Sequence, residues 1–298
     1  MDFKSIVMGL LFALIWAAAF TATRIVAIAF PPLTALVLRF ALSGLIGVGL
    51  AMAMGQRAQF SRDEWRGILV FGLCQNALYL GLNWSAMQWV EASAASIIAS
   101  MMPLIVALIG WLVLGERLRP LAIAGLITGF VGVAIIMGVR LQHGLSVPGT
   151  IMCLFAVVAL AVATLSVRGA GAGRNVMMAV GLQMAVGAVA LLPFALALEW
   201  GRPWVMDGSV AAALGFSILV PGLAATWIWM RLVTRIGAVR AATFHFLSPF
   251  LGVAIAAALL GERFGPSDVI GAAIIAAGIF MVQILRVPEA RVAVKTAA

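Results

Sequence analysis

A few polar side chains lie inside long apolar runs of this sequence, and they are its clearest candidates for binding chemistry. Arg39 is the one charged residue well inside such a run. A guanidinium there either reaches back to the membrane surface and braces carbonyl groups, or attracts the carboxylate of a bound solute. Gln183 occupies the corresponding position in the second half of the chain, again with Leu before it and Ala two residues later. A polar side chain in both halves favours positions that face other helices.

A stripe of polar residues follows one face of the apolar run at 66–85. It consists of Asn76, Tyr79 and Asn83, whose spacing of i, i+3 and i+7 places them on one side of a helix. Such groups would lack hydrogen-bond partners in lipid, so we expect this face to contact protein or a water-filled cavity. Hydrogen bonding between helices and contact with a substrate are both compatible with the pattern.

Two prolines interrupt apolar runs and free backbone carbonyl groups one turn earlier. Pro103 and Pro249 are therefore candidate hinges near the middle of the membrane. Before Pro103 lie Ser96 and Ser100, small residues that either allow close helix packing or form a cavity wall. Before Pro249 lies His245, which is either a hydrogen-bonded packing residue or a substrate ligand or proton carrier.

Aromatic residues supply a further set of candidates. Trp16 and Phe20 share a helical face at i and i+4, which suits a wall for an apolar or aromatic solute as well as packing against lipid or core. Trp227 lies deep inside a later apolar run and joins the candidate site. Aromatic rings combined with Arg39 and the amides predict a site for a small amphipathic molecule.

Composition defines the elements that must position these residues. The chain has 298 residues, of which 64% are hydrophobic and 10% charged, and its mean hydropathy is +1.17. Soluble domains carry about 25% charged residues, so the sequence indicates an all-α membrane protein. The net charge of +9 comes from Lys and Arg in short gaps between apolar runs rather than in one patch, which argues against nucleic-acid binding. Neither metal-type Cys spacing nor a Walker A motif occurs, so we expect no metal or cofactor.

Apolar runs bounded by charged residues, Gly or Pro predict ten transmembrane helices. Their approximate ranges are 5–23, 33–54, 66–85, 92–114, 120–139, 149–167, 176–198, 209–230, 238–260 and 266–286. Lys and Arg number fourteen in one set of alternate gaps and four in the other. By the positive-inside rule this asymmetry predicts that both termini are cytoplasmic.

An internal repeat divides the chain into two halves. The stretches "LGERLRP" at 114–120 and "LGERFGP" at 260–266 are nearly identical, and an offset of 146 residues also aligns Pro103 with Pro249. The repeat unit contains five predicted helices, an odd number, so the second copy must enter the membrane in the opposite orientation. We therefore expect one five-helix repeat at 1–142, an inverted repeat at 143–290 and a cytoplasmic tail at 291–298.

The repeated Gly-Glu-Arg motif itself falls at a helix end in each half. Its charged members are Glu116 and Arg117 in the first copy, and Glu262 and Arg263 in the second. A Gly at this place is a common helix C-terminal signal. The Glu can meet the positive N-terminus of the next helix and the Arg the negative C-terminus of the preceding one. We interpret the motif as a clamp on a tight helix hairpin, with gating ion pairs as the alternative.

Several of these motifs together resemble the EamA-type branch of the drug/metabolite transporter superfamily. They are the Pro within each fourth helix, the Gly-Glu at each hairpin, "WAAAFTATRI" at 16–25, Arg39, and the spaced glycines Gly125, Gly132, Gly271 and Gly278. The usual Gly after the Trp of the first motif is Ala17 here. The resemblance spans almost the whole chain. Among the members of this family, the bacterial amino-acid exporters, including YddG-like aromatic amino-acid exporters, match best in length and topology.

The resemblance implies a multi-pass transporter of the bacterial inner membrane, working by alternating access around a central cavity. We expect it to export small amphipathic metabolites, foremost aromatic or large apolar amino acids, with the lipid bilayer and a small-molecule substrate as its partners and a monomeric state. The acidic residues all lie in predicted loops or helix ends, which favours uniport or exchange. Proton-coupled multidrug or metabolite efflux is the alternative. An intramembrane enzyme would need a buried nucleophile and base, so we expect no enzymatic activity.

Overall fold

The computed structural model shows a bundle of helices, and no strand occurs in the part of the chain that it describes. The described residues are 2–116, 118–142, 144–166, 175–236, 241, 243–263 and 265–284. The first elements are α1 (Phe3–Ala29), α2 (Pro32–Ala53), α3 (Arg62–Phe71), η1 (Gly72–Leu80), α4 (Gly81–Ala86), α5 (Ala92–Ala99), α6 (Met102–Leu112) and α7 (Pro120–Gln142). They are followed by α8 (Val147–Ser166), α9 (Val176–Glu199), α10 (Gly208–Ser217), η2 (Ile218–Ala224), α11 (Ala225–Ile236), η3 (Thr243–Leu247), α13 (Ser248–Leu260) and α14 (Pro266–Ile284).

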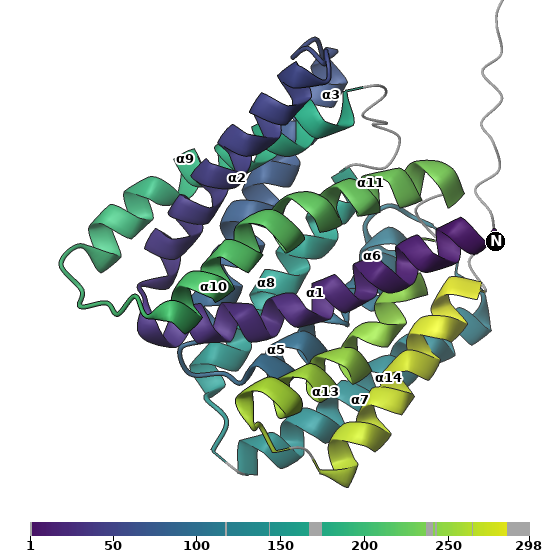
Figure 1. Ribbon diagram of the computed structural model, residues 1–298. Coiled ribbons are helices and arrows are strands. Elements are labelled where there is room, and N and C mark those ends of the chain that lie inside the picture. The colour runs from purple at the N-terminus through teal and green to yellow at the C-terminus, as the bar shows by residue number, and fades with distance from the viewer. Residues whose placement is uncertain are drawn as a thin grey trace, which may run out of the picture.

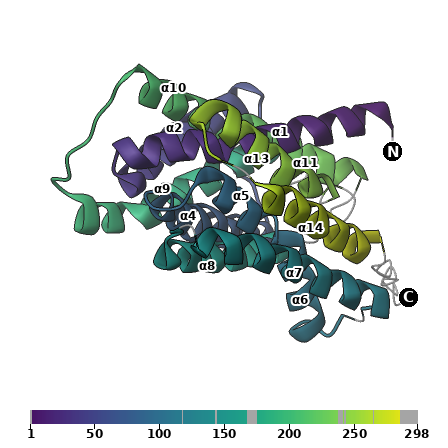
Figure 2. The same ribbon diagram turned by 90° about the horizontal axis from the view of Figure 1, so that it is seen from below.

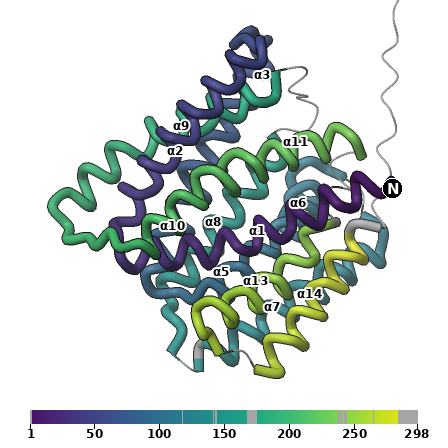
Figure 3. The backbone as a smooth tube through the Cα atoms, in the orientation of Figure 1, coloured from purple at the N-terminus to yellow at the C-terminus, as the bar shows by residue number. Residues whose placement is uncertain are grey.

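The long helix α1 crosses the middle of the molecule and separates two groups of helices (Figure 1). The pair α2 and α9 lies on one side, and α7, α13 and α14 lie on the other (Figure 3). The view from below shows α8 on the face of the molecule away from α1 (Figure 2). Buried apolar side chains form two main clusters, one around α5, α6 and α8 and one around α2 and α9.

Seven helical segments of the described chain are long and apolar enough to cross a membrane. They are Phe3–Ala29, Pro32–Ala53, Ala92–Leu112, Pro120–Arg140, Val147–Ser166, Val176–Glu199 and Gly208–Ile236. Two shorter apolar helices follow at Phe244–Leu260 and Pro266–Val282. The composite segment α3–η1–α4 covers the remaining run expected from the sequence. The protein is thus a multi-pass membrane protein, while the count of ten crossings stays a prediction.

Prolines interrupt two helices at the expected places. Ser100 and Met101 separate α5 from α6, and Pro103 lies in the first turn of α6. The short 3-10 helix η3 precedes α13, and Pro249 lies in the first turn of α13. Proline lacks the N–H that would continue the hydrogen-bond ladder but is tolerated in a first turn. Each apolar run therefore forms two helical pieces rather than one.

Two π-helical segments also interrupt the α-helical geometry. They are η1, which begins at Gly72, and η2, which begins at Ile218. Because 218 − 72 = 146, their starts are separated by the same offset as the repeated hairpin motif. A π-helix widens the turn and often occurs at functional sites. Both segments contribute residues to the cavity described below.

Glycines allow helices from the two halves of the chain to pack at backbone distance. A Cβ at Gly125 would lie 2.9 Å from the carbonyl oxygen of Gly278, and one at Gly132 would lie 2.9 Å from that of Gly271. These four glycines form the contact between α7 and α14. Small residues in this pattern replace side-chain packing by close backbone contact, as is common between membrane helices.

The hairpin motif makes a longer-range contact than the sequence indicates. The carboxylate of Glu262 accepts hydrogen bonds from the backbone N–H groups of Ala92 (2.8 Å) and Ser93 (3.0 Å), at the start of α5. The expectation that it meets the next helix, α14, is wrong for Glu262. The reason is tertiary packing, because α13 lies against α5 and brings the hairpin to the unsatisfied amides of that helix.

The structure describes most of the other members of the motif. Gly115 and Gly261 both have positive φ, 69° and 66°, as expected for glycines that end a helix. Glu116 donates its backbone N–H to the carbonyl of Gly110 at 2.9 Å, and its side chain packs beside the same glycine. Arg263 is exposed. Arg117 lies outside the described residues, as does the expected tail at 291–298.

Other helix ends carry further buried polar contacts. Glu199 accepts hydrogen bonds from the N–H groups of Leu33 (3.0 Å) and Thr34 (2.7 Å), which caps α2. Arg140 pairs with Asp268 at 3.0 Å and also contacts Glu91. The contacts of Glu199 with α2 and of Arg140 with Asp268 join the two halves of the chain. They also leave the carboxylates at helix ends, where the sequence places them.

Candidate functional site

A cavity of about 390 Å³ lies between the two halves of the chain. Its lining comes from α1, α2, α3, η1, α4 and α6 in the first half and from α8, α9, α10, η2, α11 and η3 in the second. The volume is in the range typical of sites for small organic molecules. The exposed residue Thr234 near the end of α11 belongs to the lining, so the cavity reaches the surface there.

Trp16 is the centre of an aromatic wall in this cavity. Its ring is parallel to that of Tyr79 at a centroid distance of 6.2 Å. The edges of Phe20 and His245 approach it at centroid distances of 6.3 Å and 5.4 Å. All four residues line the cavity, as their candidate roles require. The spacing of Trp16 and Phe20 on α1 therefore does place both on the side that faces other helices.

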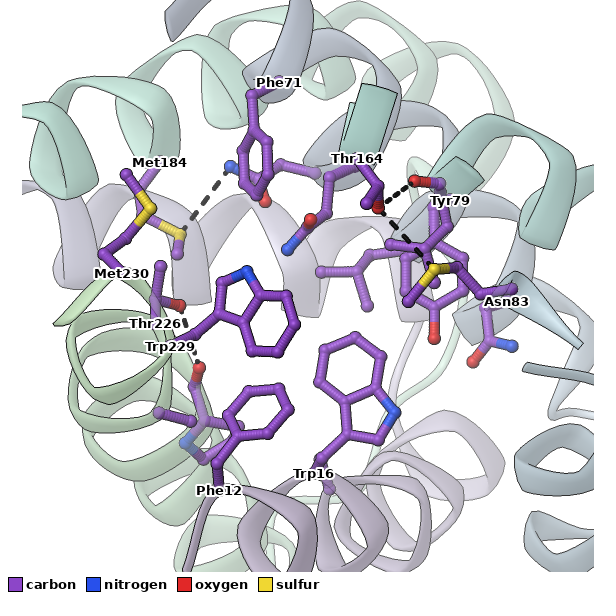
Figure 4. Close-up of a pocket in the computed structure, with 18 of the residues that line it drawn as sticks. Phe12, Trp16, Phe71, Tyr79, Asn83, Thr164, Met184, Thr226, Trp229 and Met230 are labelled. Carbon is purple, nitrogen blue, oxygen red and sulfur yellow. Dashed lines mark hydrogen bonds between the residues drawn. The ribbon is translucent and has the colours of Figure 1, made fainter. Parts of the chain in front are cut away.

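Two further aromatic residues complete the wall. Phe12 and Trp229 stack at a centroid distance of 4.8 Å, and Figure 4 shows both rings beside Trp16 around the open space. Phe12 precedes Trp16 by four residues, so extending the i, i+4 stripe of α1 by one turn would have found it. Trp229 lies deep inside the same apolar run as Trp227, and nothing in its local sequence distinguishes the two residues.

Trp227 does not line the cavity. The guanidinium of Arg231 lies 5.4 Å from the centroid of its ring, and the ring packs against the cluster around α2 and α9. Residues two apart on a helix point in nearly opposite directions, so α11 can present only one of the two tryptophans to the cavity. The structure assigns that place to Trp229.

Arg39 lines the cavity from α2. Its side chain is buried, with 5% of the residue exposed, so it does not reach a membrane surface. Its Nε donates a hydrogen bond to the carbonyl oxygen of Ser217 at 3.0 Å. The guanidinium carbon lies 5.3 Å from the ring centroid of Phe40 and 5.6 Å from that of Trp84. Arg39 thus braces a carbonyl and borders the cavity at the same time.

The stripe from η1 and α4 faces the cavity as a group. Asn76, Tyr79 and Asn83 all contribute to the lining, and Figure 4 shows Tyr79 beside Asn83. The side-chain amide of Asn76 also donates to the backbone carbonyl of Gln183 at 2.8 Å. Asn83 makes a long contact of 4.0 Å to the sulfur of Cys153. Interhelical bonding and cavity lining are therefore combined in the same side chains.

Three other candidates lie outside the cavity lining. Ser96 donates to the carbonyl of Ser248 at 3.2 Å, which joins α5 to α13. Ser100 donates to the carbonyl of Ile97 at 2.6 Å within its own turn. Gln183 is buried behind Asn76. Small or polar residues at these places serve helix contacts in this conformation.

The electrostatic character of the cavity is simple. Arg39 is the only residue with a formal charge among the described residues that line it. The remaining polar groups are amides, hydroxyls and the imidazole of His245, and aromatic and aliphatic side chains supply most of the wall. The site therefore combines one cationic side chain with an aromatic surface, which is the arrangement expected for an amphipathic solute with a negatively charged group.

An apolar helical bundle with such a cavity is compatible with a membrane transporter, and comparison with known proteins shows the family. A model described as the EamA-like transporter family matches residues 3–138 and again residues 147–284. The chain belongs to this family.

The individual relatives are named as transporters, and most of the similarity is distant. The chain is 27% identical over 262 residues to "Uncharacterized transporter YvbV" of Bacillus subtilis, which covers 85% of this chain and 83% of that protein. It is 30% identical over 112 residues to "Aromatic amino acid exporter YddG" of Ancylobacter novellus, covering 38% of this chain and 39% of the exporter. A solved crystal structure with 21% identity has a TM-score of 0.68 over 96% of this chain and 98% of that one, which supports the fold.

Proposed function

We propose that this transporter exports small amphipathic metabolites across a bacterial inner membrane, with aromatic and large apolar amino acids as its main substrates. The observation that carries the proposal is the cavity, where an aromatic wall around Trp16 and Trp229 shares one space with Arg39. A ring can contact the wall while a carboxylate approaches the guanidinium. The partial similarity to an aromatic amino acid exporter points in the same direction.

The proposed mechanism is alternating access between two inverted five-helix repeats. The repeated hairpin motif, the two family matches and the equal offset of the two π-helices support such a duplication. With ten crossings and cytoplasmic termini, the opening beside Thr234 lies on the cytoplasmic side. The contacts of Glu199, Glu262 and Arg140 then close the opposite side. In this proposal the structure represents an inward-facing state of a monomer, and Pro103 and Pro249 act as hinges.

We further propose that transport is uniport or exchange without strong ion coupling, because the described carboxylates lie at helix ends and not in the cavity. The second candidate function is proton-coupled efflux of drugs or other metabolites. The observation that favours it is His245, an ionisable side chain in the aromatic wall.

Solute flux in proteoliposomes that contain the purified protein would test both functions. Labelled phenylalanine, labelled alanine and a cationic dye would each be measured with and without an imposed pH gradient, and protein-free liposomes would serve as the control. Phenylalanine flux that is saturable and indifferent to the gradient is the expected result. Flux of the dye alone, or flux that requires the gradient, would contradict the proposal and favour a proton-carrying role for His245.

A further inference from the structure

The positive charge of Arg39 has no anionic partner within the described part of the chain. The hydrogen-bond acceptor found for its guanidinium is the neutral carbonyl of Ser217, and its other neighbours are the rings of Phe40 and Trp84. A buried charge is costly unless an opposite charge or several hydrogen bonds compensate it. Arginine offers further N–H donors in a planar fork that fits a carboxylate. A cavity-lining guanidinium that has no anionic partner and retains free N–H donors can bind an anion.

Two residues beside Arg39 add hydrogen-bond donors to the cavity lining. The indole N–H of Trp84 and the hydroxyl group of Ser217 are buried and have no hydrogen-bond partner within the described residues. Both residues line the cavity, and both are direct neighbours of Arg39. Buried donors normally find a partner. A carboxylate beside Arg39 would be the nearest candidate acceptor after a small adjustment of these side chains.

The ammonium group of a bound amino acid would need an acidic partner, but carboxylates of the chain are engaged elsewhere. Glu199 and Glu262 cap α2 and α5, and Asp268 pairs with Arg140. Among the residues outside the described part, the sequence contains one acidic side chain, Glu289. An ammonium group in the cavity would therefore meet amide oxygens and aromatic faces rather than a carboxylate of the described lining.

We infer that the donors around Arg39 form a carboxylate subsite, and that solutes need an apolar body and a carboxylate but no ammonium group. Arylalkyl monocarboxylates would then be ligands alongside amino acids. The inference rests on the proposed function for the position of the site, but it names a different substrate class. It also assigns Trp84 and Ser217 to substrate recognition, two residues that the sequence patterns do not distinguish.

Equilibrium binding to the unmodified, detergent-purified protein tests the inference independently of transport. Four compounds of similar size would be compared by calorimetry near pH 7.5: phenylalanine, 3-phenylpropanoate, phenylalaninamide and 3-phenylpropanamide. We expect 3-phenylpropanoate to bind at least as tightly as phenylalanine. Both amides should bind at least about tenfold more weakly, because a charge-assisted hydrogen bond is lost. Binding of phenylalanine without binding of 3-phenylpropanoate would overturn the inference and leave the amino-acid proposal intact.

Variants then assign the effect to Arg39. Arg39→Gln should weaken 3-phenylpropanoate binding at least about tenfold and leave 3-phenylpropanamide unchanged, since only the former carries the charge. Arg39→Lys keeps the charge but not the fork and should recover part of the loss. Arg24→Gln is the control, because Arg24 binds the carbonyl of Met87 outside the cavity lining. Equal weakening of the acid and its amide in Arg39→Gln would contradict a carboxylate subsite.

Competition for phenylalanine transport separates the two proposals further. In proteoliposomes at neutral pH, unlabelled 3-phenylpropanoate should compete with labelled phenylalanine on the same side of the membrane. If no phenylalanine flux is observed but 3-phenylpropanoate binds in the Arg39-dependent way, the amino-acid proposal fails and the carboxylate subsite stands. If phenylalanine is transported and 3-phenylpropanoate does not compete, the carboxylate subsite as proposed fails.

Discussion

At the scale of single residues, two neighbouring tryptophans on one helix have different environments. Trp229 stacks on Phe12 and lines the cavity, whereas Trp227 faces Arg231 and the apolar cluster around α2 and α9. Both residues have the same chemistry and similar depth in the sequence. Only their direction from α11 distinguishes them, and this makes them a matched pair for substitution.

Trp229→Leu should raise the KM for phenylalanine about tenfold, because a stacked aromatic contact with the solute is replaced by an aliphatic one. Alanine transport, if present, should change much less. Initial rates of labelled uptake into proteoliposomes would measure both. Trp227→Leu is the control and should leave the KM within about twofold. A larger effect of Trp227→Leu than of Trp229→Leu would show that the cavity wall has been assigned to the wrong face of α11.

A residue outside the membrane segments gives a pH prediction. Asp207 caps α10, and hydrogen bonds from the backbone N–H of Val210 and from Ser209 lower the pKa of its carboxyl group below the ordinary value. A carboxyl group whose pKa is lower in the folded state stabilises the fold above the unfolded pKa, and this contribution is lost as the pH falls through the folded pKa.

The titration of Asp207 can be followed by carbon NMR of selectively labelled protein. Its midpoint should lie below the ordinary value for an aspartate side chain, about 3.9. In Ser209→Ala the midpoint should move upward, because one of the donors to the charged form is removed. An unchanged midpoint in Ser209→Ala would contradict the described cap.

At the scale of helices, the contacts between α7 and α14 depend on the absence of side chains. A Cβ at Gly278 would lie 2.5 Å from the backbone nitrogen of Gly129 and 2.6 Å from the carbonyl oxygen of Gly125. Backbone atoms cannot move aside as a flexible side chain can. Gly138 on α7 has no atom within 4 Å of the corresponding position and is available as a matched control.

Gly278→Ala should lower the free energy of unfolding of the purified protein by about 1–3 kcal/mol, because the two helices must separate to accept the methyl group. Gly138→Ala should be neutral or stabilising by up to about 1 kcal/mol, since alanine favours the helix and nothing obstructs it. Thermal unfolding in detergent, followed by tryptophan fluorescence, would compare them. Equal stability of the two variants would contradict the close packing of α7 and α14.

At the scale of the whole molecule, the cavity reaches the surface at one end, while buried polar contacts join the two halves at the other. Thr234 is exposed at the open end, near the end of α11. Ser209 is exposed at the start of α10, at the opposite end of that helical segment. These two positions therefore report on the orientation of the protein and on the side to which the cavity opens.

Labelling of single cysteines in intact cells and in inverted membrane vesicles would test this arrangement. In a background without Cys74 and Cys153, Thr234→Cys should react with a membrane-impermeant maleimide only from the cytoplasmic side. Ser209→Cys should react only from the outside. Excess phenylalanine should slow the labelling of Thr234→Cys and leave Ser209→Cys unchanged. Reaction of both cysteines from the same side would contradict the predicted topology.

The sequence by itself determined the class of protein, because hydropathy and residue period act locally along the chain. Long apolar runs can be satisfied only as helices in lipid, and the proline breaks and the terminal glycines follow from backbone geometry. The stripe of Asn76, Tyr79 and Asn83 could be found in the same way, since hydrogen-bonding groups require a face away from lipid.

The tertiary structure decided which residues share the cavity and which partners the charges find. No local signal distinguishes Trp229 from Trp227, because their selection depends on how α11 is rotated against α1. Glu262 meets α5 across 170 residues of sequence rather than its own hairpin. Arg39 reaches Ser217 in the other half of the chain. Such contacts arise when helices distant in sequence pack together, and the direction of each side chain is then fixed by its neighbours in space.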